Sequence, residues 1–222
     1  MSSWYDEVRT SLRDPAQIRP TLARAAAVQP LSELVECLLE RPDELERCAR
    51  WSFVHTLGFE KLVLIAAPPL FMLRLHLWRP GVPNLRHVHN HRADIASAVV
   101  RGRLDKRLYR RVGTGIPFIE YREHNFGHAW GLYPVGPAEL EVVTSDRIGP
   151  GQIYDLPTTA LHQVDPHPSD TTVTLFVEMA KTCSTTQVFA PVSEPLPQRT
   201  DKSPLDGEAL RRRLRLALTD LG

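Results

Sequence analysis

The sequence predicts a core of β-strands flanked by helical segments at both ends of the chain. Short apolar segments separated by glycine and proline follow one another from about residue 59 to residue 190, and 19 of the 222 residues are proline. Short strands at this spacing are typical of an antiparallel barrel or sandwich. We therefore expect a helical N-terminal region over 1–58, a β-domain over 59–190, and a linker with a C-terminal helix over 191–222.

The N-terminal region is expected to be helical from residue 3 to about residue 57. Its apolar residues recur every three or four positions, and Ser32 fits the N-cap of the helix that carries Leu34. The apolar stripe continues through Phe53, and Gly58 fits a C-terminal stop.

The C-terminal region divides into two parts. Residues 191–204 are rich in proline, serine and threonine, which indicates a linker or a surface strap. Residues 206–221 have the apolar spacing of an amphipathic helix, with an arginine run that we interpret as a solvated face rather than a nucleic-acid contact.

One strand before the middle of the chain has two different faces. In residues 70–78, Leu73 and Leu75 alternate with Arg74 and His76, which predicts one apolar and one mixed face. The other segments with strand character lie near 61–67, 95–100, 103–112, 117–123, 129–134, 138–144, 152–156, 160–164, 171–178 and 186–190.

Composition argues against several classes of partner. The net charge is +1, which gives no sign of nucleic-acid or membrane binding. Three cysteines without a paired spacing suit a reducing compartment. The N-terminus lacks the pattern of a signal peptide, and no apolar run approaches the roughly 20 residues that span a bilayer. We expect a cytoplasmic protein that acts on a small molecule.

The residues with the clearest chemical signature are histidines. His87, His89 and His91 alternate, so in a strand their side chains point to one face. His162 follows about seventy residues later, in a segment rich in glycine and proline. Neutral imidazole nitrogens are ligands for Fe, Zn, Cu or Ni, so this pattern predicts a metal site if the fold brings His162 to the first cluster.

Two segments resemble the paired motifs of the cupin superfamily. The stretch from His89 and His91 to Gly102 is similar to the first motif, an HxH pair followed by a strand and a glycine. The stretch from Gly151 to His162 is similar to the second, G-x5-P-x-G-x2-H, and matches it at Gly151, Pro157 and His162, with Thr159 in place of the second glycine. The resemblance covers about residues 60–190. It implies a cupin-type barrel (a double-stranded β-helix) with a metal ion held by His89, His91 and His162.

The first motif departs from the usual pattern, because most cupins add a glutamate ligand after the HxH pair. Counting back from Gly102 places Ile95 at that position. The pair could instead be His87 and His89, followed by Asp94; we favour His89 and His91, with His87 as a possible further ligand. A site without the carboxylate resembles the three-histidine enzymes of the cysteine dioxygenase type. This resemblance implies Fe(II) and O2, with Zn, Ni or Mn as other candidate metals.

Several further side chains are candidates for contact with substrate. Arg74 could hold a substrate carboxylate if its face of the strand looks into the barrel, and is otherwise a surface residue. Tyr109 and Tyr154 could orient substrate or donate a proton, and are otherwise core aromatics. Asp94 is a candidate acceptor for the far N–H of a ligand histidine, and Ser97 shares the face of Ile95.

The resulting interpretation is a mononuclear non-haem Fe(II)-dependent dioxygenase acting on a small polar substrate such as an amino acid or a thiol. One alternative keeps the site but uses Zn, Ni or Mn as a Lewis acid in an isomerase, lyase or dehydratase. Another is a cupin that binds a ligand and turns nothing over, since the fold hosts many functions. The terminal helices are expected outside the barrel, covering one mouth or forming a homodimer contact.

Overall fold

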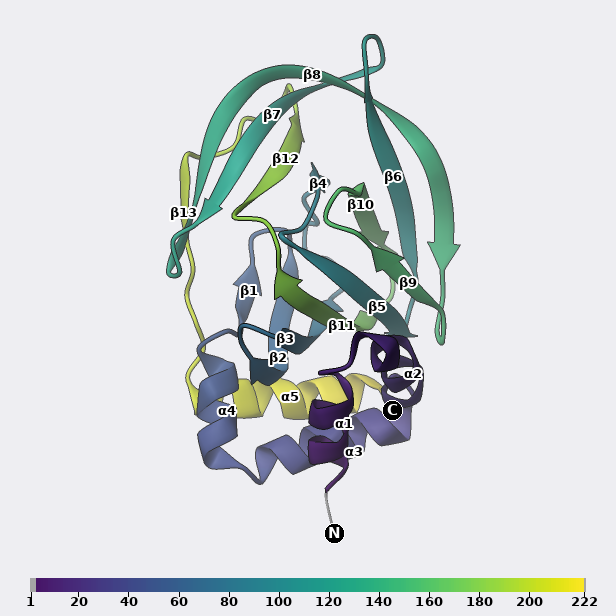
Figure 1. Ribbon diagram of the computed structural model, residues 1–222, viewed down its shortest axis with the longest axis vertical. Coiled ribbons are helices and arrows are strands. Elements are labelled where there is room, and N and C mark those ends of the chain that lie inside the picture. The colour runs from purple at the N-terminus through teal and green to yellow at the C-terminus, as the bar shows by residue number, and fades with distance from the viewer. Residues whose placement is uncertain (1–2, 222) are drawn as a thin grey trace.

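Helices at both ends of the chain pack below a β-sandwich in the computed structural model, which describes residues 3–221 (Figure 1). Four helices precede the strands and one follows them within this range. They are α1 (Trp4–Ser11), α2 (Pro15–Ala25), α3 (Val28–Leu39), α4 (Pro42–Ala49) and α5 (Gly207–Leu221).

The strands form two antiparallel sheets. The first sheet has the order β1 (Phe53–His55), β2 (Phe59–Ala67), β3 (Phe71–Trp78), β11 (Thr172–Lys181), β5 (Ala93–Arg101), β9 (Ile153–Leu156). The second has the order β13 (Arg199–Asp201), β8 (Ala129–Ile148), β6 (Leu104–Val112), β10 (Leu161–Pro166), β4 (Val88–His89), β12 (Thr185–Pro191), β7 (Ile116–Asn125), and β7 also pairs with β8. This two-sheet, cupin-like sandwich with terminal helices confirms the predicted fold class.

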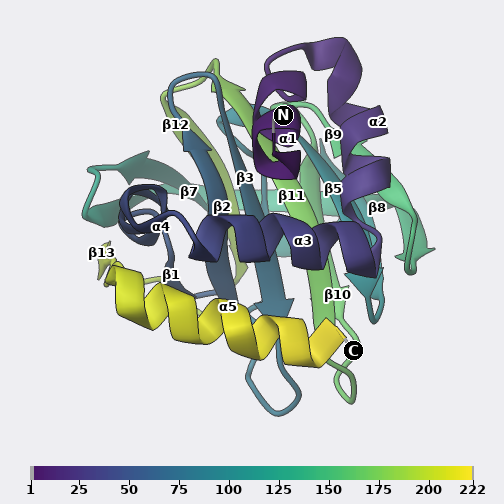
Figure 2. The same ribbon diagram turned by 90° about the horizontal axis from the view of Figure 1, so that it is seen from below.

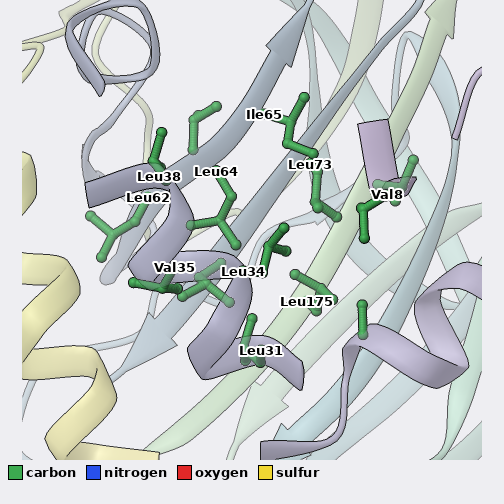
Figure 3. Close-up of a cluster of buried hydrophobic side chains, with 14 of the residues drawn as sticks. Val8, Leu31, Leu34, Val35, Leu38, Leu62, Leu64, Ile65, Leu73 and Leu175 are labelled. Atoms are coloured by element: carbon green, nitrogen blue, oxygen red, sulfur yellow. The ribbon is translucent and has the colours of Figure 1, made fainter. Parts of the chain in front are cut away.

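The main hydrophobic core lies between the helices and the outer face of the first sheet. Figure 2 shows α3 and α5 running across β2, β3 and β11. In the close-up of Figure 3, Leu34 and Leu38 of α3 face Leu62 of β2 and Leu73 of β3, all with at most 1% of their surface exposed. Side chains alternate along a strand, so the residues of β3 that do not face the helices point into the interior of the sandwich. The helices therefore cover a sheet face, and among the helical residues described within 3–221 it is Arg47, near the end of α4, that lines the interior cavity.

The helical region ends earlier than the apolar stripe predicts. Helix α4 stops at Ala49, and Phe53 lies in β1, where it pairs with Lys61 of β2. Phe53 packs edge-on against Trp130 at a ring distance of 5.4 Å, so contacts with a distant strand decide its conformation. Ser32 is not a cap either: helix α3 begins at Val28, and the Ser32 hydroxyl donates to the Val28 carbonyl within the helix.

Two other segments differ from expectation. The strands expected near 129–134 and 138–144 are one curved strand, β8, whose pairing with β7 shifts by one residue beside Gly136 (φ +145°). The strap after residue 191 contains β13, where Thr200 pairs with Trp130. No helix within residues 3–221 has both the length and the apolar character needed to cross a membrane.

Candidate metal centre

Strand pairing brings the two histidine motifs together. His162 of β10 is the direct partner of His89 in β4, and His91 follows two residues after His89. The ring centroid of His162 lies 4.5 Å from that of His89 and 4.8 Å from that of His91, and one ring nitrogen of each residue lies within 4.8 Å of the other two. The predicted three-histidine cluster is therefore present, and it could hold a metal ion. His87 lines the same cavity but lies outside this group.

Backbone carbonyls orient two of the three imidazoles. The Nδ1 atom of His89 lies 3.2 Å from the carbonyl oxygen of His87, and Nδ1 of His162 lies 3.3 Å from that of Ala160. A ring that donates its Nδ1 proton to a carbonyl presents an unprotonated Nε2. Such a bond fixes the tautomer and the ring orientation of a metal-ligating histidine. Both rings are thus set to offer Nε2 as a ligand.

The three histidines are held in their neutral form. Burial lowers the pKa of His89, and it lowers the pKa values of His91 and His162 well below their usual range. The proximity of the rings adds to the effect, because a proton on one disfavours a proton on the next. Neutral imidazole is the form that binds a metal ion.

The position of the usual cupin glutamate is occupied by an apolar side chain. Ile95 is 1% exposed and packs with Leu156 and Phe176, and the Phe176 ring centroid lies 5.8 Å from that of His91. Within residues 3–221, the group capable of holding a metal consists of histidines alone. Three neutral nitrogen donors suit a divalent transition metal and leave coordination positions for other molecules.

Asn90 and Asp94 fix the loop that leads to His162. The Asn90 amide donates to the Thr158 carbonyl at 2.9 Å, while its oxygen accepts the Gln187 N–H at 2.7 Å. The Asp94 carboxylate accepts the Thr158 N–H at 2.8 Å. Because Asp94 alternates with the inward-facing Ile95, it lies outside the cavity and does not meet an imidazole, contrary to the role expected for it.

We predict that Asn90→Ala weakens metal binding about tenfold. Loss of the bond to Thr158 loosens the loop that leads to His162, and loss of the bond from Gln187 loosens the chain between His89 and His91. A matched control is Asn84→Ala, which removes one amide bond to the Val164 carbonyl farther along β10. The measurement is a competitive Zn2+ or Co2+ titration of both variants, with circular dichroism as a check on folding. Equal metal affinity of Asn90→Ala and the wild type would argue against this positioning role.

Arg74 faces the cavity, but its guanidinium already has partners. Nη1 donates to the Glu178 carboxylate at 2.5 Å, and Nε donates to Nε2 of His76 at 2.8 Å. The guanidinium also lies over the Phe176 ring, 4.3 Å from its centroid. Burial alone would raise the pKa of Glu178, but the charges of Arg74 and Lys61 outweigh it and lower that pKa to about 2. Arg74 thus stays a candidate for substrate contact. A substrate carboxylate that bound to it would have to displace the carboxylate of Glu178.

The two tyrosines lie in different places. Tyr154 of β9 lines the cavity and is the strand partner of Ser97 in β5. Burial raises the pKa of Tyr154, so the phenol keeps its proton. Tyr109 lies outside the cavity lining: it packs against Phe118, and its hydroxyl donates to Gln163 Oε1 at 2.7 Å. The Tyr109 proton is therefore engaged away from the cavity, and the structure does not bring Tyr109 to the histidine cluster. The Ser97 hydroxyl is fully buried next to Tyr154, its strand partner.

One cavity of about 780 Å³ connects the histidines to side chains that sequence reasoning missed. Its wall carries a series of ring contacts: Phe176 with His76 at 4.6 Å, His76 with Phe59 at 4.5 Å, and Phe59 with His55 at 4.6 Å. Lys61 and Lys202 lie on the same wall. In the sequence Lys61 only opens a short apolar run, and nothing local indicated that it faces the cavity or that the strap after residue 191 carries Lys202 there.

Comparison with known proteins gives distant structural matches and no sequence match. The 11S globulin of Wrightia tinctoria matches at 11% identity over 65% of this chain, with a TM-score of 0.38, and the chain spans only 29% of the globulin. An RmlC-like cupin from Shewanella frigidimarina matches at 12% identity over 59% of this chain and 84% of its own, with a TM-score of 0.35. Ectoine synthase from P. lautus matches at 14% identity over 72% and 93%, with a TM-score of 0.35. No family model and no curated protein matches the sequence.

Proposed function

We propose that this protein is a mononuclear non-haem Fe(II)-dependent oxygenase that acts on a small polar molecule such as an amino acid or a thiol. The observation that carries the proposal is the set of three neutral imidazoles, His89, His91 and His162, on the wall of a cavity large enough for a substrate. Bound Fe(II) would supply the open coordination positions at which substrate and O2 meet.

The chain's own residues would prepare that encounter. The carbonyls of His87 and Ala160 hold two imidazoles with Nε2 forward, which reduces the reorganisation needed when the metal binds. Ile95 and Phe176 exclude water beside His91 and add no charge to the site. The Tyr154 phenol, protonated and facing the same cavity, would be available to give a proton to a bound substrate.

The Tyr154 phenol also supports a second candidate. A Zn, Ni or Mn ion in the same site would act as a Lewis acid, and Tyr154 would move protons in a lyase, isomerase or dehydratase reaction. This candidate needs no oxidant, so oxygen dependence separates it from the oxygenase.

The test begins with metal analysis of protein purified without chelators, followed by anaerobic loading with Fe(II). We expect one iron per chain, and O2 uptake that requires both iron and a member of a panel of small amino acids and thiols. Turnover without oxygen on Zn, Ni or Mn would favour the second candidate. Failure to load iron under any condition would rule out the oxygenase, and tight ligand binding without product would indicate a binding protein.

A further inference from the structure

We infer that the cavity binds a carboxylate-bearing substrate whose anionic group is held by Lys61 and Lys202, at a distance from the metal centre. The inference rests on the proposed function in taking the bound molecule to be the substrate. The position of the carboxylate follows from the structure, because the two lysines line the same cavity as the three histidines.

The cavity wall carries more cations than carboxylates. Its carboxylates are Glu123 and Glu178, and both are engaged by the protein. Glu178 pairs with Arg74 at 2.5 Å and with Lys181 at 3.9 Å, and Glu123 accepts the Thr186 hydroxyl at 3.0 Å. The basic residues include Lys61, Arg74, Arg92, Lys181 and Lys202. An anionic ligand would offset this excess of positive charge.

Lys61 is one of the basic residues of the cavity that the protein leaves without a carboxylate partner; within residues 3–221, Arg92 and Lys202 are others. The Lys61 amine lies over the Phe53 ring, 5.0 Å from the centroid. Lys202 is held differently: its ammonium donates to Asn125 Oδ1 at 2.8 Å and to the Gly127 carbonyl at 2.9 Å, both neutral acceptors, and lies over Trp130 at 4.4 Å.

Aromatic rings join the two lysines and would hold the body of the ligand. Phe53 lies under Lys61, Trp130 lies under Lys202, and the two rings meet edge-on at 5.4 Å. Lys61 is the strand partner of His76, whose ring contacts Phe176 next to the metal ligand His91. The carboxylate would therefore bind beside Lys61, with the rings of His76 and Phe176 between it and His91. A different group of the substrate would approach the metal.

Binding should also move a proton. Burial lowers the pKa of Lys61 well below its usual range, and the nearby cations lower it further, while Glu178 alone raises it. A carboxylate beside Lys61 would raise that pKa again and favour uptake of a proton. The titratable and charged groups that face Lys61 or act on its charge are Arg74 and His76 of β3, Glu178 and Lys181 of β11, His55 of β1, and Lys202 after β13.

The experiment compares small carboxylates with their primary amides, from acetate and acetamide to benzoate and benzamide, by calorimetric titration of the full chain. We expect at least one carboxylate to bind tenfold or more tightly than its amide, with proton uptake revealed by buffers of different ionisation enthalpy. Lys61→Met should lower that affinity tenfold or more and keep the wild-type metal content. The control Arg110→Met removes an equal charge from an exposed ion pair with Glu141 and should change the affinity less than twofold.

His162→Ala separates this inference from the proposed function, because it should lose the metal and keep the preference for carboxylates. Lys61→Arg keeps the charge and should retain most of the affinity, which guards against misfolding of Lys61→Met. The inference is overturned if no carboxylate binds more tightly than its amide, or if folded Lys61→Met binds the preferred carboxylate as the wild type does.

Discussion

His162→Ala is expected to abolish retention of a divalent metal, with at least a hundredfold loss of affinity for Zn2+ or Co2+. His162 alone brings the second motif to the cluster, and two nitrogens from His89 and His91 cannot hold a transition metal as three do. The measurement is metal content after dialysis, together with a competitive chelator titration.

The matched control for that variant is His87→Ala. His87 is 7% exposed and lines the same cavity, but it contributes only its backbone carbonyl to the orientation of His89. We expect a loss of affinity of tenfold or less, since alanine keeps that carbonyl. A folded His162→Ala variant that retains metal as the wild type does would refute the assignment of the ligands.

Arg74→Met is expected to destabilise the fold by about 3 kcal/mol, because it leaves the largely buried Glu178 carboxylate without its closest partner. Denaturant unfolding at pH 7 measures the change. The control Arg110→Met breaks an exposed pair and should change the free energy of unfolding by less than about 1 kcal/mol. Arg74→Met with wild-type stability would contradict the structural role of this pair.

The same pair predicts how stability depends on pH. The pKa of Glu178 is lowered to about 2 in the folded protein, against an ordinary value of 4.5. A lowered folded-state pKa stabilises the protein above pH 4.5, and this contribution is lost as the pH falls from 4.5 towards 2. Glu178→Gln should therefore unfold with a shallower pH dependence than the wild type between pH 5 and 3, which denaturant titrations at each pH will show.

The strands and the members of the histidine cluster could be predicted because they carry clear local sequence patterns. Alternation along residues 70–78 assigned Arg74 and His76 to one face, and that face lines the cavity. The loop before His162 also follows its sequence: Gly151 has a φ of +79°, and a turn closes from the Ala160 N–H to the Pro157 carbonyl at 2.9 Å. Histidine spacing, these turn signals and the resemblance to the two cupin motifs together were enough to predict the cluster.

What could not be predicted depends on contacts between distant segments. Phe53 continues a helical stripe in sequence, yet its packing on Trp130 places it in a strand. The partners of Arg74 and Asp94 are Glu178 and Thr158, which are 104 and 64 residues away. Lys202 reaches the cavity only because β13 joins the edge of β8. The charge balance of the cavity is therefore a property of the assembled fold.

In the proposed site three imidazoles converge on one divalent cation, and X-ray absorption of the Co2+- or Fe2+-loaded protein can count them. We expect one metal per chain, with three imidazole nitrogens at about 2.0–2.2 Å from it and water in the remaining positions. In His162→Ala we expect one imidazole fewer or no bound metal. A wild-type spectrum with fewer than three imidazoles, or a protein that takes up no metal, would contradict it.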